Sequence, residues 1–372
     1  MLVRITDIQR CEVRPGRLVE WTLSPATVAA AAALPDDSRR PAYIQESHIR
    51  TAGYVREDGL FVPTWLGTAF DLPGPVGLDA LERALRTWTV RHEPLRSGFR
   101  WAGDELRRFT LDASDVSLCR KDAGDFPDAD GLVRYLQDRF DTAADALRWP
   151  NLLYTAVVRD DGASVYLAFD HSNVDAYSVQ RIPAEIRELY TAGPAGAGTE
   201  AHPPAASYVD FCEIERAQAD GIDGRHAIVD RWREFIRRCG GTLPGSFPEA
   251  LRAVRAELQA NRSLARMPLP RVLDLLGADF RPTSPDLYSI VSYVDTRATA
   301  GAERWAELKA YGLLRVSYGD QVCVWVNRLP EGLWLASRHP DTDVAAKNMR
   351  LYVERLRDRI ASVAHGSLSA VS

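Results

Sequence analysis

The sequence predicts an α+β protein with two structured parts. Helical and strand-like patterns are mixed in both halves of its 372 residues, without the regular βαβ alternation of a parallel sheet. Residues 191–207, TAGPAGAGTEAHPPAAS, are rich in Gly, Ala and Pro and lack a periodic apolar pattern. Neither a G-x-G-x-x-G nor a G-x-x-x-x-G-K-[ST] loop occurs. We therefore expect an N-terminal part at 1–190, a linker at 191–207, a C-terminal part at 208–372, and no nucleotide site.

The elements of the first part follow from the spacing of apolar residues. Leu81, Leu85 and Trp88 have helical spacing in a segment that Pro94 closes. Two β-rich runs flank Asp160-Asp161-Gly162, and because Asp-Gly tolerates the positive φ values of a tight turn, they predict a hairpin. The predicted elements are a helix at 77–91, strands at 95–101 and 105–111, a helix at 131–140, the hairpin strands 151–159 and 163–169, and a helix at 177–190.

The second part combines helices and strands as well. Gly240-Gly241 is a glycine pair of the kind that ends helices, so it predicts the end of a helix that begins near His226. The predicted elements are helices at 208–219 and 226–239, strands at 286–295, 321–327 and 333–337, and a long amphipathic helix at 343–363.

Composition excludes several classes of protein. The formal net charge is −5 and basic residues are scattered among acids, so we expect no binding to nucleic acid. Five widely spaced cysteines form no C-x-x-C pair and no Cys/His cluster at zinc spacing, which predicts reduced thiols and no metal. The N-terminus lacks the apolar core of a signal peptide, and the run 28–34 is far shorter than the roughly 20 apolar residues of a membrane helix. We expect a soluble, cytoplasmic protein without a transmembrane segment.

One histidine has a position that suggests catalysis. The spacing H-x-x-x-D occurs three times, at His171, His226 and His339, so the pattern by itself is weak. His226 and Asp230 have the spacing of an ordinary pair on a solvated helix face, and His339 precedes a proline in a turn. His171 alone falls where a predicted strand ends and a helix follows, a place where a rigid element can present a reactive side chain.

Two interpretations of His171 remain open at this level. It can be a partly buried histidine that bonds to neighbouring backbone, or a general base, because an imidazole with an ordinary pKa near 6.5 can abstract a proton at cellular pH. No serine or cysteine lies in a nucleophile motif such as G-x-S-x-G. If His171 is catalytic, the chemistry is therefore base catalysis without a covalent enzyme intermediate.

An ordered series of segments resembles the CoA- and carrier-protein-dependent acyltransferases. FDHSNVDAYS, around His171, is similar to the H-H-x-x-x-D-G motif of that superfamily, and VRHEPLRSGF resembles a segment of condensation domains. The other segments look most like the polyketide-associated acyltransferases or the helices that follow the linker in condensation domains: LVEWTLSPA, YIQESHIR, YVDFCEIERA, DRWREFI, SYVDTR, DQVCVWVNR and RHPDT. The resemblance covers nearly the whole chain.

This resemblance implies two chloramphenicol-acetyltransferase-like lobes that form a V with a central tunnel. His171 would be the general base that takes the proton of a hydroxyl or amine acceptor as it attacks an acyl thioester. Asp175 would support the site by pairing with an arginine, for which Arg96 and Arg297 are the candidates, because a buried carboxylate needs a charged partner. The donor would be an acyl-CoA or an acyl or peptidyl phosphopantetheinyl carrier protein, the acceptor a small molecule or lipid, and no cofactor would stay bound.

Two positions depart from the family motif. Asp170 replaces its first histidine, which the resemblance assigns to structural support of the site, and Ala176 replaces its glycine. These departures keep two alternatives open. One is a non-catalytic condensation-like domain that binds a carrier protein. The other is a condensation-like enzyme that modifies a tethered chain by dehydration, cyclisation or epimerisation.

Overall fold

The computed structural model describes residues 4–59, 63–196, 205–238, 247–280, 290–316, 322–329 and 332–364. Helices and strands are mixed throughout, so the predicted α+β class is confirmed. Contacts group the chain into two compact units, one of Met1–Glu213, Val291–Tyr318 and Val324–Ala336, and one of Ile214–Ile290, Gly319–Cys323 and Ser337–Ser372. The larger unit thus includes segments from the C-terminal third of the chain. The V-shaped arrangement with its tunnel and the boundary at 191–207 stay predictions.

A seven-stranded sheet forms the centre of the larger unit. Six neighbouring pairs connect its strands, and all are antiparallel except the parallel pair of β1 and β10. In spatial order the strands are β1 (Arg4–Thr6), β10 (Tyr311–Val316), β3 (Thr64–Pro73), β8 (Gly162–Asp170), β7 (Leu152–Arg159), β2 (Gly16–Leu23) and β6 (Leu118–Phe126). Because β10 lies between β1 and β3, this sheet is completed by residues from the predicted C-terminal part.

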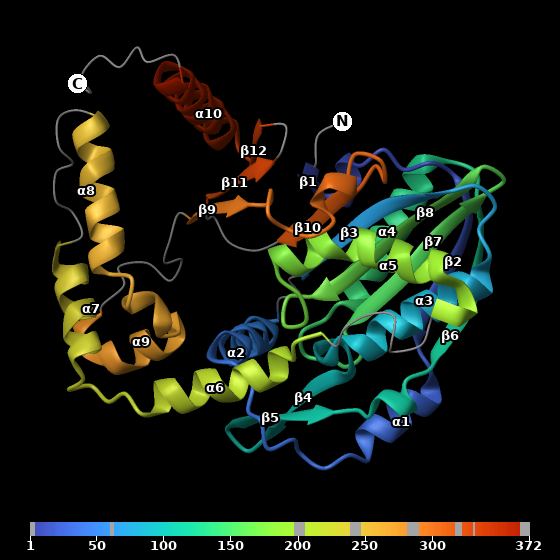
Figure 1. The fold of residues 1–372 in the computed structure, drawn as a ribbon, viewed down its shortest axis with the longest axis horizontal. Coiled ribbons are helices and arrows are strands. Elements are labelled where there is room, and N and C mark those ends of the chain that lie inside the picture. The colour runs from blue at the N-terminus through green and yellow to red at the C-terminus, as the bar shows by residue number, and fades with distance from the viewer. Residues whose placement is uncertain are drawn as a thin grey trace. The chain divides into compact units, whose positions relative to one another are not determined.

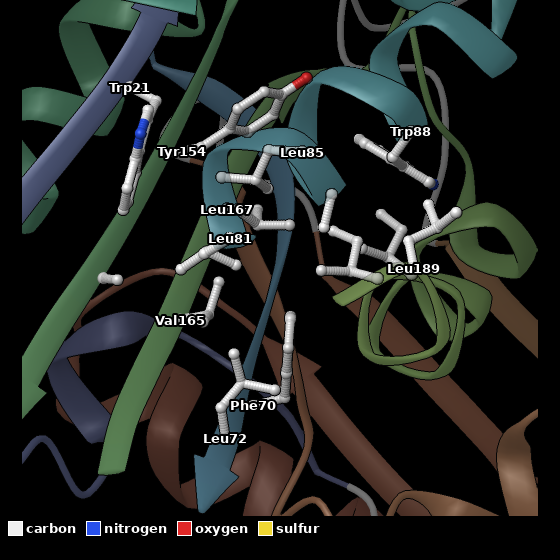
Figure 2. Close-up of a cluster of buried hydrophobic side chains, with 14 of the residues drawn as sticks. Trp21, Phe70, Leu72, Leu81, Leu85, Trp88, Tyr154, Val165, Leu167 and Leu189 are labelled. Atoms are coloured by element: carbon white, nitrogen blue, oxygen red, sulfur yellow. The ribbon is translucent and has the colours of Figure 1, made fainter. Parts of the chain in front are cut away.

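Helices cover both faces of this sheet. On β8 the side chains of Val165, Leu167 and Phe169 belong to one buried cluster, and those of Tyr166 and Ala168 to another, as the alternation of a strand requires. The first cluster lies under α3 (Leu78–Arg91) and α5 (Ala176–Gly196), and the second under α4 (Ala129–Ala143) (Figure 1). Figure 2 shows the first cluster, with Leu81 and Leu85 of α3 near Leu167 of the strand. Strand β8 is therefore buried on both faces up to its last residue, Asp170.

The hairpin of β7 and β8 is confirmed, with its turn at Asp160 and Asp161. Gly162 has a φ of +152°, and a Cβ there would lie 2.5 Å from the carbonyl oxygen of Leu72 on β3. Only glycine fits this close approach of two backbones.

Two smaller sheets and further helices complete the described residues. A two-stranded sheet pairs β4 and β5, and a three-stranded sheet has the order β12, β11, β9. The remaining bounds are α1 (Pro25–Ala32), α2 (Tyr43–Glu57), β4 (Ser97–Ala102), β5 (Glu105–Thr110), α6 (Tyr208–Asp220), α7 (Ala227–Arg238), α8 (Phe247–Ala260), α9 (Leu269–Leu276), β9 (Ile290–Asp295), β11 (Cys323–Leu329), β12 (Gly332–Arg338) and α10 (Asp343–Ala364), with 3₁₀ turns at Ile8–Arg10, Glu93–Arg96, Ala113–Asp115, Leu264–Arg266, Gly277–Asp279 and Ala302–Arg304.

Most predicted elements are present, with shifted ends. Helix α5 runs to Gly196 across a break at Gly193, whose φ is +63°, so it extends into the predicted linker. Strand β4 begins at Ser97, because a 3₁₀ turn occupies the residues before it. The glycines predicted to end α7 and residues 286–289 of the predicted strand lie outside the described residues.

The smaller unit has a core of its own, formed by Val229 of α7 with Met267, Val272 and Leu276. Within the described parts of the chain, no helix combines the length and apolar character needed to cross a membrane. Of the described cysteines, Cys119 is exposed and Cys323 is buried, and both are free thiols.

Candidate functional site

The connection from β8 to α5 presents His171 on an ordered turn. Asp170, the last residue of β8, accepts the N–H of Ser172 on Oδ1 at 2.9 Å and that of Asn173 on its carbonyl oxygen at 3.0 Å. Asp175 caps α5, since its Oδ1 accepts the N–H of Ser178 at 2.7 Å. His171 lies between these two turns with its side chain exposed.

Neighbouring elements hold this connection from two sides. Asn151, just before β7, accepts the Asp170 N–H on its carbonyl oxygen at 2.9 Å and the Asn173 side-chain amide on Oδ1 at 2.7 Å. Gln45 of α2 donates from Nε2 to the carbonyl oxygen of Ser172 at 2.8 Å, and both residues are buried. Such support keeps the turn in one conformation, which a reactive side chain requires for accurate placement.

His171 borders a cavity of about 780 Å³ within the larger unit. That size lies within the range of small-molecule sites. Most of its wall area is apolar, and polar atoms come from His171, His48, Arg181 and the group Arg91, His92 and Glu185, among others. The apolar and aromatic side chains are Ile44, Trp88, Pro94, Leu95, Val174, Ile182, Ala205, Ala206 and Tyr208. Among the residues that the structure describes, no group of three His, Cys, Asp or Glu side chains is arranged to hold a metal ion.

The buried Asp170 is paired with a histidine from another element. Its side chain is 0% exposed, and its Oδ2 lies 2.9 Å from Nε2 of His48 on α2. Burial acts to raise the pKa of Asp170, but the hydrogen bond and charge of His48 and the bonds from Ser172 hold that pKa below its ordinary value. Burial acts to lower the pKa of His48, but Asp170 raises it above its ordinary value. The two side chains therefore favour the charged pair.

This pair predicts a particular dependence of stability on pH. Because the pKa of His48 is raised above 6.5, its contribution is complete below 6.5 and is lost as pH rises through the folded-state pKa. Because the pKa of Asp170 is lowered below 3.8, its contribution is present above 3.8 and is lost as pH falls through the folded-state value. Urea unfolding of wild type and Asp170→Asn should thus differ most at mildly acidic pH, with the difference shrinking toward alkaline pH. A difference that stays constant across that range would contradict the pairing.

A second ionic group lies in the cavity wall. Glu185 of α5 lies 2.7 Å from Nε of Arg91 and 3.0 Å from Nε2 of His92, and it accepts from Nε1 of Trp88 at 3.2 Å. Burial acts to raise the pKa of Glu185, but His92 and Arg91 hold it below its ordinary value. This group joins the end of α3 to α5. Because its polar atoms bond to one another, we assign it a structural role.

The predicted partners of Asp175 are corrected by the geometry. Arg96 donates to the carbonyl oxygens of Val90 and Leu111, and Arg297 forms an exposed pair with Asp295 at 2.7 Å. Asp175 is itself exposed and bonds to the first turn of α5, so it needs no arginine. Of the predicted supporting residues, the structure brings Asp170 and Asp175 beside His171 and leaves both arginines in other contacts.

Three residues that support the turn were not predicted from the sequence: Gln45, His48 and Asn151. Gln45 and His48 are three residues apart on α2 and so lie on one helix face, which meets the turn that carries His171. A signal for His48 does exist in the sequence, since a carboxylate in place of the motif's first histidine requires a cation if it is buried. Local spacing could not predict which helix supplies this cation, because α2 lies more than a hundred residues away from Asp170 in the chain.

Comparison with known proteins finds sequence similarity to two acyltransferases. No family model matches it. It is 26% identical over 248 residues to the 2'-acyl-2-O-sulfo-trehalose (hydroxy)phthioceranyltransferase PapA1 of Mycobacterium tuberculosis, covering 66% of this chain and 47% of that protein. It is 27% identical over 242 residues to the trehalose-2-sulfate acyltransferase PapA2 of the same species, covering 64% and 50%. The chain therefore spans about half the length of these curated relatives.

Solved structures decide the fold. A structure of PapA2 acyl transferase matches with a TM-score of 0.81 and 21% identity, covering 94% of this chain and 97% of that one. The chain has the fold of condensation-domain-like acyltransferases. The starter condensation domain of rhizomide synthetase RzmA also matches, with a TM-score of 0.59 and 14% identity over 89% of this chain and 97% of that domain. The family resemblance predicted from the sequence is confirmed, and the motif's departures at Asp170 and Ala176 occur within a condensation-type fold.

Ala176 fits this fold without strain. It is the first residue of α5, and among described residues other than glycine only Lys309 has a positive φ. The backbone at position 176 therefore does not require glycine, and a Cβ is compatible with it.

Proposed function

We propose that this condensation-type protein transfers an acyl group from a CoA or carrier-protein thioester to a hydroxyl or amine acceptor. The observation that carries the proposal is the placement of His171, exposed on a braced turn at the edge of a largely apolar cavity. Apolar walls suit an acyl chain, and the names of the similar proteins describe acyl transfer to sulfated trehalose. A sugar hydroxyl is accordingly the first acceptor to test.

His171 acts as the base in this proposal. Its neutral imidazole takes the proton of the acceptor while the acceptor oxygen or nitrogen forms a bond to the thioester carbonyl carbon. The tetrahedral intermediate then collapses, the carbon–sulfur bond breaks, and the imidazolium returns the proton to the departing thiolate. Ester or amide and free thiol are the products, and no covalent enzyme intermediate forms.

A panel of thioesters tests the proposal. Short and long acyl-CoAs and acyl chains on a phosphopantetheinyl carrier protein would each be mixed with sugar-hydroxyl and amine acceptors, with thiol release and product mass as readouts. We expect thiol release that depends on the acceptor, together with an acceptor heavier by the acyl group.

Other results would favour the alternatives. Loss of water, or an unchanged mass, on a chain that stays attached to its carrier would indicate modification of a tethered chain. Binding of a carrier protein without any chemical change across the panel would indicate a non-catalytic domain. Either result would overturn acyl transfer.

A further inference from the structure

Asp170, which replaces the motif's first histidine, pairs with a histidine from a distant segment of the chain. Asp170 is fully buried at the end of β8 and engages Nε2 of His48, so the imidazole beside His171 comes from α2. The ring centroids of His48 and His171 are 6.2 Å apart, and their planes are inclined by 58°. Both side chains border the same cavity. Two imidazoles at this separation on one cavity can both act on a group that binds between them.

The other ring nitrogen of His48 is available to a ligand. Nε2 faces a carboxylate, which only accepts, so Nε2 carries a proton. Among the described residues, Nδ1 has no hydrogen-bond partner. It is also not one of the fully buried polar atoms. The side chain is 23% exposed and lines the cavity, which leaves Nδ1 as its accessible polar atom. Nδ1 donates a hydrogen bond only when the ring is protonated on both nitrogens.

The surrounding charges favour that protonated ring. Asp170 raises the pKa of His48 above its ordinary value against the effect of burial, and it is the charged group that acts on His48 directly. On α2 itself, Glu46 and Arg50 pair with each other. The other titratable or charged groups around the cavity are His171, Asp175, Tyr208, Arg91, His92, Arg181 and Glu185. Of these, Arg91, His92 and Glu185 form their own group.

We propose that His48 is a second catalytic residue, whose Nδ1–H donates to the thioester carbonyl oxygen as that oxygen becomes an oxyanion. The inference rests on the proposed acyl transfer. His171 transfers the proton, whereas His48 keeps the protons on both of its ring nitrogens. Negative charge develops on the carbonyl oxygen as the acceptor bond forms. That charge is lost when the carbon–sulfur bond breaks. Charged donors of this kind act on the transition state more than on the bound substrate.

His48→Gln is the sharpest test. A glutamine amide can still donate to Asp170 but offers no donor at the position of Nδ1, so the brace is kept and the catalytic contact is lost. We expect kcat to fall about 10²–10³-fold, as for loss of one oxyanion donor, and KM for the thioester to change by less than about threefold. His226→Gln, which changes a histidine outside the cavity lining, is the control and should match wild type.

The pH profile separates catalysis from mere support. The rate should fall at alkaline pH as His48 loses its proton. In wild type this fall should coincide with the titration of His48 measured by NMR. In Asp170→Asn it should move to lower pH. The NMR comparison needs no variant and decides the matter if His48→Gln does not fold. A kcat within about threefold of wild type for folded His48→Gln, or an alkaline limb unrelated to His48, would overturn the role. Wild type that transfers no acyl group would instead overturn the proposed function, and this role with it.

Discussion

Purified His171→Ala is expected to transfer acyl groups about 10²–10⁴-fold more slowly than wild type, the usual contribution of a general base. The loss should appear in kcat, because the exposed imidazole at the cavity edge acts in the transition state and contributes little to binding the thioester. Initial rates with the best thioester and acceptor of the panel measure it. Circular dichroism should show an unchanged fold, since an exposed side chain in a turn adds little to packing.

A matched variant makes this result specific. His226→Ala removes a histidine with the same H-x-x-x-D spacing, but its Nδ1 accepts the N–H of Ile228 at 3.1 Å at the start of α7. It should keep wild-type rates. If folded His171→Ala transferred acyl groups as fast as wild type, His171 would not be the base.

Phe169→Ala is expected to destabilise the larger unit by about 3–5 kcal/mol, the usual effect of emptying a buried aromatic site. The Phe169 side chain is 0% exposed, and its ring centroid lies 5.6 Å from that of Trp88 and 6.0 Å from that of Tyr154. Its removal leaves a cavity between β8 and α3, directly before Asp170. Urea unfolding at constant pH, followed by circular dichroism, measures the change in the free energy of unfolding.

The control for this experiment is an aromatic residue nearby in the chain. Tyr177 is 50% exposed at the start of α5, so Tyr177→Ala should change the free energy of unfolding by no more than about 0.5 kcal/mol. A Phe169→Ala variant as stable as Tyr177→Ala would show that the end of β8 does not depend on this core.

Local patterns were sufficient to predict the turn that carries His171. The β-rich run that forms β8, the Asp-Gly turn before it and the helical spacing after it are properties of neighbouring residues, and each predicted element is confirmed. The family resemblance then supplied the chemistry. Ala176 shows the limit of a motif, because its backbone position at a helix start does not need the family's glycine.

Contacts between distant segments could not be predicted in this way. His48 reaches Asp170 across 122 positions of the chain, and Gln45 reaches Ser172 across 127. Spacing rules describe one helix or strand at a time, so they cannot say which helix supplies a partner for a buried carboxylate. The prediction of an arginine partner for Asp175 was wrong for the opposite reason. That carboxylate caps the helix that follows it, so its hydrogen-bond partner is a nearby residue in the chain.

Strand β10 has a consequence for how this protein can be divided. It supplies the strand between β1 and β3, and the segment just before it adds Trp305, Leu308 and Ala310 to the buried cluster that includes Phe169. A polypeptide ending at residue 190 would contain His171 and His48 but neither this strand nor these side chains. During biosynthesis the sheet stays incomplete until the ribosome has passed Val316. The N-terminal segment is therefore not a module that can be exchanged between enzymes on its own, and any chimera that keeps the site must also keep residues 302–316.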